Sequence, residues 1–295
     1  MNHLSKETAK IALMSDTERM NRILAYKWIG YTRAREIQAT MDYLMLHPKI
    51  HRMPNLLLVS RSGNGKTQLL QRFFDAHKPE ITSTGDHRII PVIYVQAPPR
   101  PEEKAFYVNI LEALNAPYNV RNNVYVLRQQ SISILKNVET KILILDEIHH
   151  VLAGSHLSQR AFLNEIKYLA NELQIVIIAA GIKDALVAIN TDNQLANRFE
   201  PAILPKWTMD EEYLRLLSSF EAILPLREPS DLATEELAMK ILSLSGGTIG
   251  EISAVLKKAA LEAIKTRKER IDLSLLGRGN FIAPSNRQKQ YEHLI

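Results

Sequence analysis

The stretch "LLLVSRSGNGKTQLL" at residues 56–70 constrains the fold more than any other part of the chain. An apolar run leads into a glycine-containing loop, and a helical pattern follows from the lysine onward. Backbone N–H groups at a helix N-terminus bind anionic oxygens, to which a lysine adds charge and a hydroxyl adds a Mg²⁺ ligand. The stretch therefore predicts a strand, a phosphate-binding loop and a helix in immediate succession.

The loop supplies each chemical group that a nucleoside triphosphate requires. Lys66 is the expected partner of the β- and γ-phosphates, and Thr67 is the expected Mg²⁺ ligand. Ser60 stands where such loops usually begin with glycine, but that position mainly turns the chain out of the strand. We therefore expect ATP and Mg²⁺ as ligands. The predicted cofactor-binding residues of the loop are Ser62, Gly63, Asn64, Gly65, Lys66, Thr67 and Gln68.

Short apolar runs alternate with helical patterns through the middle of the chain. The runs lie at 55–60, 90–96, 141–146 and 174–180, and the helical stretches at 66–76, 103–115, 122–137 and 158–172. Nearly continuous apolar runs are typical of parallel strands covered on both faces. The alternation predicts an α/β core in which helices flank a parallel sheet.

Helical patterns without strands follow "LPKW" at 204–207, and Gly246-Gly247 separates the last two of them. Helical periodicity also precedes the core, where it is interrupted at "WIGYTRA" and ends before Pro48. We therefore expect four parts. They are an N-terminal helical segment at 1–50, an α/β core at 51–205, a small all-helical domain at 206–275 and a flexible tail at 276–295.

The stretch "KILILDEIHH" gives the second signal of a nucleotide site. Asp146 closes an apolar run and is expected to hold Mg²⁺, usually through water, while Glu147 is expected to polarise the attacking water. An acidic pair that only caps the next helix is the alternative. His149 and His150 are interpreted as residues of the first turn of that helix, because no partner motif for a metal site accompanies them.

Composition excludes several classes of protein. The chain of 295 residues has no cysteine, so it has neither a disulfide framework nor a thiolate metal site. No segment approaches the roughly 20 apolar residues of a membrane helix, so we expect a cytoplasmic protein without a membrane partner. The net charge of +5 suits weak binding to DNA by one copy and stronger binding by many copies.

Two further stretches resemble elements of AAA+ ATPases. In that family an arginine at the position of "NQLANRFEPAILPKW" reaches the γ-phosphate of the neighbouring subunit, which makes Arg198 the candidate; a solvated surface arginine is the alternative. A turn at the position of "WIGYTRAREI" closes over the adenine ring, which indicates Ile29, Gly30 and Tyr31; packing between helices is the alternative. The resemblance implies a P-loop AAA+ core followed by a helical lid, with Lys66, Glu147 and Arg198 as catalytic residues.

Two positions depart from the AAA+ pattern. The run "IVIIAAGIKDAL" should end in a polar sensor residue, but Ala179, Ala180, Gly181 and Ile182 carry no side chain that forms hydrogen bonds. Ser253 stands where the lid usually has an arginine. We therefore expect slow ATP hydrolysis, which suits a switch better than a motor.

Together, these stretches resemble transposition regulators of the TniB/TnsC type over roughly residues 15–270. The resemblance rests on "WIGYTRARE", "HRMPNLLLVSRSGNGKT", "LILDEIHH", "LANRFEPAILPKW" and "GGTIGEISAVLKKAALEAI". It implies an AAA+ ATPase that assembles as a ring or helical filament on double-stranded DNA without sequence preference. It also implies that the protein links a target-selector protein to a DDE transposase.

The segment "APPRPEEKAFY" lies where initiator-type AAA+ proteins insert a DNA-facing element. Arg100 and Lys104 there, and Arg121 further on, are the candidate DNA-binding residues and would contact phosphates. A solvated loop is the alternative. The basic run at 257–270 is interpreted as a solvated helix face.

Two other functions remain open at this stage. A DnaC/IstB-like helicase loader or another initiator-type ATPase would carry the same motifs, and a neighbouring gene for a replicative helicase rather than a DDE integrase would favour it. A nucleotide-gated scaffold that does not hydrolyse ATP would explain the missing sensor residues, and a phosphate-release assay separates it from both enzymes.

Overall fold

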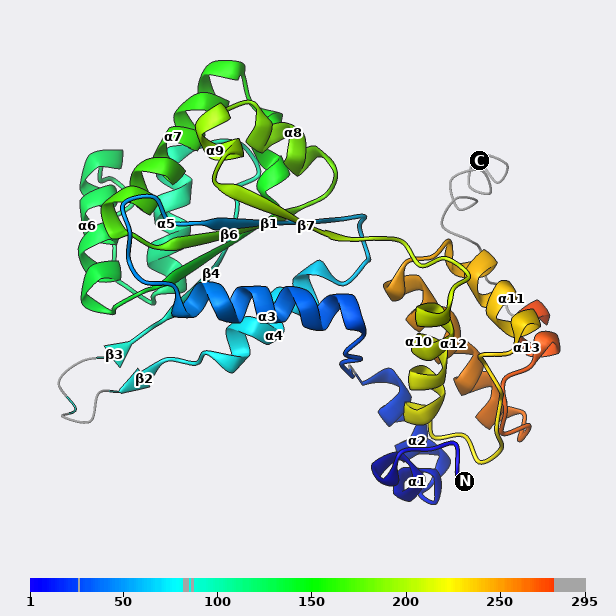
Figure 1. The fold of residues 1–295 in the computed structure, drawn as a ribbon. Helices are drawn as coiled ribbons and strands as arrows, with labels where there is room; N and C mark the ends of the chain where they lie inside the picture. Colours follow the sequence, from blue (N-terminus) through cyan, green and yellow to red (C-terminus); the bar gives the residue numbers. More distant parts are fainter. Residues whose placement is uncertain (26, 82–84, 86–87, 279–295) are drawn as a thin grey trace. The chain divides into compact units, whose positions relative to one another are not determined.

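The computed structural model describes residues 1–25, 27–81, 85 and 88–278, which form two compact units (Figure 1). The α/β unit runs from Arg33 to Leu204. The helical unit combines Met1–Thr32 with the described residues from Pro205 onward. Among the helices of these ranges, none is both long enough and apolar enough to cross a bilayer.

A five-stranded parallel sheet forms the centre of the α/β unit (Figure 1). Its strand order is β4-β5-β6-β1-β7, and every neighbouring pair is parallel. Because the strands are parallel, all their carboxyl ends lie at one edge, which positions the site described below. The strands are β1 (Asn55–Ser60), β4 (Val92–Gln96), β5 (Ile142–Asp146), β6 (Val176–Gly181) and β7 (Phe199–Leu204).

Strand β7 lies outside the four runs that the sequence predicts. It pairs with β1 from Asn55 beside Phe199 to Ser60 beside Leu204, and it forms one edge of the sheet. Its exposed residues and Pro201 interrupt the apolar run. Proline has no backbone N–H to donate to a neighbouring strand, so within a sheet it is tolerated mainly in edge strands. A small antiparallel pair, β2 (Glu80–Ile81) and β3 (Arg88–Ile89), is also absent from the prediction.

Strands β1, β5 and β6 are buried on both faces, as their apolar runs predict. Leu57, Leu143 and Ile177 belong to one core cluster with the helices that follow β4, β5 and β6. Leu56, Ile144 and Ile178 are equally buried on the opposite face, where Figure 1 shows α3 and α4. The helices of this unit are α3 (Thr32–Leu46), α4 (Lys66–Ala76), α5 (Glu103–Ala113), α6 (Val124–Asn137), α7 (His156–Leu173), α8 (Asp184–Asn190) and α9 (Asn193–Ala196).

Local signals explain where the main helices begin. Asn123 accepts a hydrogen bond from the backbone N–H of Val126 at the start of α6, and Ser155 does the same for Ser158 at the start of α7. The predicted helices at 66–76, 103–115, 122–137 and 158–172 correspond to α4, α5, α6 and α7. The short helices α8 and α9 have too few turns to show a helical period in the sequence.

The helical unit has a core of its own. Its helices are α1 (Lys6–Ala12), α2 (Asp16–Leu24), α10 (Glu211–Ile223), α11 (Glu235–Ser245), α12 (Ile249–Lys265) and α13 (Leu273–Arg278). Arg19 is fully buried and donates hydrogen bonds to the carbonyl of Pro225 and to Glu269, which ties α2 to the later helices. Gly246 and Gly247 have φ of 60° and 75°, and a Cβ at Gly247 would lie 2.6 Å from the carbonyl oxygen of Trp207.

The two units differ from the predicted four parts in their boundaries. Residues 1–32 pack with the C-terminal helices, while α3 packs in the α/β unit, so 1–50 is not one body. Leu275 and Leu276 belong to the core of the helical unit, which therefore extends past 275. The remaining predicted tail, 279–295, lies outside the described residues.

Candidate functional site

The loop between β1 and α4 has the backbone of a phosphate-binding loop. Gly63 and Gly65 have φ of 70° and 87°, a left-handed conformation that other residues adopt only with strain. The buried amide of Asn64 donates to the carbonyl oxygen of Leu204 at 3.0 Å, which ties the loop to the end of β7. The N-terminus of α4 therefore opens at the carboxyl edge of the sheet. Ser62, Thr67 and Gln68 are exposed around it.

Lys66 is buried and points back into this loop. Its Nζ atom lies 3.3 Å from the carbonyl oxygens of Ser60 and Arg61 and 3.4 Å from the Ser60 hydroxyl oxygen. Burial lowers the pKa of Lys66, and the carboxylates of Glu147 and Asp146 oppose that shift. A phosphate group would give this ammonium a charged acceptor in place of neutral carbonyls. The serine at position 60 thus contributes a hydroxyl beside Lys66.

Asp146 brings the second motif to the same edge of the sheet. Its Oδ2 atom accepts hydrogen bonds from the Thr67 hydroxyl at 3.0 Å and from the Tyr94 hydroxyl at 2.5 Å. Its Oδ1 atom accepts from the backbone N–H of Glu147 at 2.8 Å. A hydroxyl and a carboxylate in contact at a phosphate-binding loop are the oxygen ligands that Mg²⁺ prefers. Thr67 and Asp146 therefore fit the predicted metal role.

Tyr94 is a site residue that the sequence does not reveal. It lies on β4, beside Ile144 of β5, and its hydroxyl reaches the end of the neighbouring strand. Burial and the hydrogen bond to Asp146 raise the pKa of Tyr94, so the phenol stays protonated and acts as a donor. An apolar run such as "PVIYVQ" carries no signal that separates this tyrosine from an ordinary strand residue.

Glu147 follows Asp146 in a left-handed conformation, with φ of 57°. It precedes the 3-10 helix η1 (Ile148–Ala153), whose first turn carries His149 and His150. The Nδ1 atom of His149 lies 3.1 Å from Glu147 Oε2 but is not aligned for a hydrogen bond. His150 has its Nδ1 atom 3.4 Å from the carbonyl oxygen of Ala97. One ligand atom from each of Glu147, His149 and His150 lies within 4.8 Å of the others.

Arg198 lies at the amino ends of the strands, whereas the loop lies at their carboxyl ends. It directly precedes β7, and its carbonyl oxygen accepts a hydrogen bond from the N–H of Asn55 at the start of β1. The six residue steps from Arg198 to Leu204, which lies beside the end of β1, place it roughly 20 Å from the phosphate-binding loop, at ~3.3 Å per residue. Its Nη1 atom donates to Asn171 Oδ1 at 2.7 Å. The structure therefore separates Arg198 from the other predicted catalytic residues of the same chain.

The predicted adenine-contacting residues belong to the helical unit. Ile29 and Tyr31 pack against its core, and the ring of Tyr31 lies 5.0 Å from that of Trp207 at an angle of 73°. Gly30 lies between them outside any helix or strand. Contact between Ile29, Gly30 or Tyr31 and an adenine base stays a prediction.

The three candidate DNA-binding residues follow β4 along the chain. Arg100 and Arg121 are exposed. Lys104 lies in the first turn of α5, and its Nζ atom donates to the carbonyl oxygen of Val120 at 2.6 Å. This bond holds the start of α5 beside the loop that carries Arg121. Their contact with DNA stays a prediction.

The two expected sensor positions lie at the end of β6 and on α12. Ala179, Ala180 and Gly181 are buried at the end of β6. A Cβ at Gly181 would lie 2.8 Å from the Cβ of Ala185 and 3.2 Å from His149 Nδ1. Ser253 is half-buried on α12 in the helical unit.

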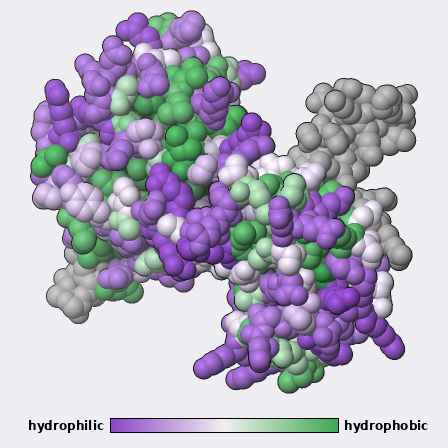
Figure 2. All heavy atoms as spheres, turned by 45° about the vertical axis from the view of Figure 1, so that its right-hand side comes forward, coloured by the Kyte–Doolittle hydropathy of each residue, from purple (hydrophilic) through white to green (hydrophobic). Residues whose placement is uncertain are grey.

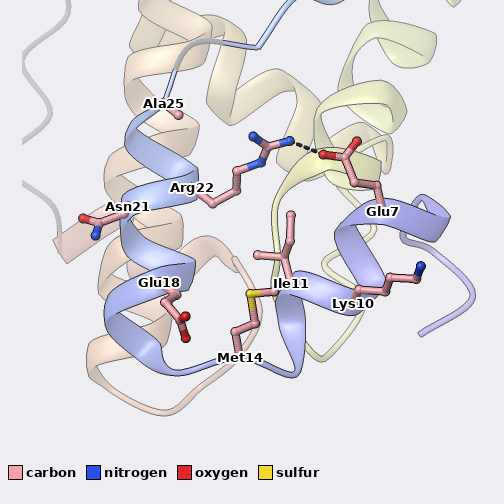
Figure 3. Close-up of a pocket in the computed structure, with 8 residues that line it drawn as sticks. All are labelled: Glu7, Lys10, Ile11, Met14, Glu18, Asn21, Arg22 and Ala25. Atoms are coloured by element: carbon pink, nitrogen blue, oxygen red, sulfur yellow. Dashed lines mark hydrogen bonds and ion pairs between the residues drawn. The ribbon is translucent and has the colours of Figure 1, made fainter.

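A separate, open pocket of about 520 Å³ lies between α1 and α2 (Figure 3). Arg22 reaches Glu7 across it, and Ile11 and Met14 lie between the two helices. Its mixed charges do not converge on one point. Figure 2 shows hydrophobic residues interspersed with hydrophilic ones over the visible face of both units, so the surface colouring alone does not mark a site.

Many solved structures share the fold, including the three that follow. The ORC2 protein of Aeropyrum pernix in ADPNP-ADP complexes is 17% identical, with a TM-score of 0.62 over 87% of this chain and 70% of that chain. Cdc6p of Pyrobaculum aerophilum is 15% identical, with a TM-score of 0.59 over 88% and 68%. The ORC1 protein of Aeropyrum pernix in complex with DNA is 16% identical, with a TM-score of 0.55 over 88% and 67%.

These likenesses confirm the predicted fold class, a P-loop AAA+ core with a parallel sheet flanked by helices, followed by a small helical domain. No curated protein matches the sequence. A family model described as "Bacterial TniB protein" matches residues 19–209, which is more than half of the chain. The match covers the loop of Lys66, the acidic pair and Arg198, and the chain therefore belongs to the TniB family.

Proposed function

We propose that this protein is an ATP-hydrolysing regulator of DNA transposition that binds ATP and Mg²⁺ and assembles on DNA. The observation that carries the proposal is the meeting of Lys66, Thr67, Asp146 and Glu147 at one edge of the sheet in a TniB-family chain. Lys66 begins α4 after the loop that follows β1, and the acidic pair lies at the end of β5, about 80 residues later in the chain. Phosphoryl transfer depends on this kind of positioning and charge stabilisation.

Each residue of the site has a separate role in the proposed ATP hydrolysis. The loop N–H groups and Lys66 would bind the phosphates, and Thr67 and Asp146 would hold Mg²⁺, whose positive charge would stabilise the negative charge of the triphosphate. Glu147 takes a proton from water as the water oxygen bonds to the γ-phosphorus. The bond from that phosphorus to the oxygen bridging to the β-phosphate breaks, and ADP and phosphate leave. Without a sensor side chain at the end of β6, we expect slow turnover.

The DNA and partner roles extend this proposal. The exposed Arg100 and Arg121 support phosphate contacts without sequence readout, and the Aeropyrum pernix ORC1 protein, of similar fold, is known in complex with DNA. Membership of the TniB family supports a role between a target-selector protein and a DDE transposase. We propose that ATP-bound copies form a ring or filament on double-stranded DNA and that hydrolysis releases them.

The variant Glu147→Gln tests the proposal. It should bind ATP as the parent protein does but turn it over at least about 100-fold more slowly, because the general base is lost. It should also remain on DNA when ATP is supplied, as measured by phosphate release and by sedimentation with duplex DNA.

The matched control is Glu200→Gln, which changes an exposed glutamate on β7. It should hydrolyse ATP and leave DNA at the parent's rates. Equal hydrolysis by the parent and Glu147→Gln would exclude Glu147 as the base. ATP binding without hydrolysis by the parent, with or without DNA, would instead favour the nucleotide-gated scaffold.

A further inference from the structure

The end of β6 is crowded although it lacks a polar side chain. The backbone of Gly181 lies against α8 and against His149, so that a Cβ there would come within 3.2 Å of His149 Nδ1. The imidazole therefore occupies space that a side chain at position 181 would need. The polar group at this edge of β6 comes from η1 instead of from the strand itself.

His149 also lies against the predicted general base. Its Nδ1 atom is 3.1 Å from Glu147 Oε2, and within the described chain it has no aligned hydrogen-bond partner. The imidazole and the carboxylate are 18% and 30% exposed, so protein surrounds most of both groups. The two atoms are within hydrogen-bonding distance, so the bond lacks only alignment. Glu147 itself leaves β5 in a left-handed conformation, which fixes the start of its side chain.

We propose that His149 is a positioning residue for Glu147 and that its Nδ1–H holds Oε2 while the other carboxylate oxygen takes the proton from water. The inference rests on the proposed ATP hydrolysis. Burial lowers the pKa of His149, with Glu147 opposing the shift, which keeps the imidazole neutral with one N–H to donate. A donor from η1 would thus orient the base where β6 offers none.

A transition-metal site is the competing interpretation of these residues. Glu147, His149 and His150 have ligand atoms within 4.8 Å of one another. Such a site would need both histidines, whereas the positioning role needs only His149. His150 faces the carbonyl oxygen of Ala97 through its Nδ1 atom, which makes it a matched control on the same turn of η1.

The experiment compares His149→Asn, His149→Gln and His149→Ala with His150→Ala. An asparagine amide nitrogen occupies the position of Nδ1, bonded to Cγ, whereas a glutamine amide lies one bond further out, nearer the position of Nε2. We expect His149→Ala and His149→Gln to lower kcat for ATP about 10- to 100-fold, as misplacement of a catalytic group does. His149→Asn should keep most of the parent's kcat, and KM for ATP should not change.

Three controls make the result decisive. His150→Ala should keep the parent's kcat; an equal loss in His150→Ala would overturn the proposal in favour of a metal site or a packing role. His149→Ala should bind a fluorescent ATP analogue normally, which shows that the loop is folded. In a Glu147→Gln background His149→Ala should cause no further loss, because the base on which it acts is already absent.

The outcomes also separate this inference from the proposed function. A parent protein that hydrolyses no ATP with or without DNA would overturn the proposed function. A parent that hydrolyses ATP while all three His149 variants match its kcat would overturn only the positioning role. Equal losses in His149→Asn and His149→Ala would overturn it as well, because the Nδ1 position would then not matter.

Discussion

Tyr94 shows how a residue outside the motifs can set the properties of a site. Its hydroxyl and that of Thr67 both donate to Oδ2 of Asp146, so the tyrosine orients the carboxylate from the neighbouring strand. Groups that orient a metal ligand typically change metal affinity 10- to 100-fold when they are removed. Tyr94 is therefore expected to affect the Mg²⁺ requirement more than the affinity for ATP itself.

The variant Tyr94→Phe removes only that hydroxyl. We expect the Mg²⁺ concentration for half-maximal ATP hydrolysis to rise about tenfold. The measurement is a Mg²⁺ titration at saturating ATP, with Tyr118→Phe as control, since the Tyr118 hydroxyl donates to Glu112, a glutamate outside the site. An unchanged titration in Tyr94→Phe would mean that Thr67 and the backbone orient Asp146 without help.

The site residues that the sequence could predict are those that are adjacent in the chain. Lys66 and Thr67 are adjacent, as are Asp146 and Glu147, because a phosphate loop and a strand end each present consecutive residues. Tyr94 reaches Asp146 from the neighbouring strand, and His149, although it is only two residues from Glu147, also lies against Gly181 of β6. Such contacts leave no local pattern in a single sequence, and only the fold reveals them.

At the scale of elements, burial on both faces decided which strands could be predicted. The runs of β1, β4, β5 and β6 stand out because nearly every residue is apolar, whereas β7 has exposed positions among its buried ones and contains Pro201. The long helices α4 to α7 carry a full helical period, and α8 and α9 are too short to show one. Element type was thus predictable where packing imposes a repeat over several residues.

The segments after β4 lead to a prediction about DNA. Arg100 and Arg121 are exposed, while the Nζ atom of Lys104 already bonds the carbonyl oxygen of Val120. Arg100→Ala combined with Arg121→Ala should weaken DNA binding and flatten the log–log dependence on salt by about 1.8, or roughly 0.9 for each lost phosphate contact. The measurement is a binding titration with duplex DNA over a range of salt concentrations.

The control for this pair of substitutions changes two lysines in the basic run of the helical unit. Lys258 and Lys265 are exposed on α12, so Lys258→Ala with Lys265→Ala removes the same charge from another surface. This second pair should leave the salt slope unchanged. The reverse result, a flatter slope only for the α12 pair, would place the DNA-binding surface on the helical unit.

At the scale of the whole molecule, the α/β unit keeps the phosphate-binding loop and Arg198 at opposite edges of one sheet. In this arrangement Arg198 cannot reach the nucleotide of its own chain, so a catalytic role requires a neighbour. Arg198→Ala should bind ATP but hydrolyse it roughly 10³- to 10⁵-fold more slowly, as the loss of such arginines does in related enzymes. Lys66→Ala should fail to bind ATP.

Mixing the two inactive variants tests the neighbour directly. The intact nucleotide site of an Arg198→Ala subunit can receive the arginine of a Lys66→Ala subunit, so phosphate release should partly recover. Light scattering first establishes that the two variants assemble together. Co-assembly without recovery would show that Arg198 is a surface arginine held by Asn171.

The opposite placement of Arg198 and the loop also gives each molecule a direction. Copies joined head to tail either close into a ring or continue as an open filament, and the two forms differ at their ends. In a ring every nucleotide faces an arginine, whereas an open filament leaves one terminal nucleotide without one. The activity of each subunit would then depend on filament length. Short filaments would have the largest share of nucleotides without an arginine, and cutting a long filament into pieces would lower its rate of ATP hydrolysis.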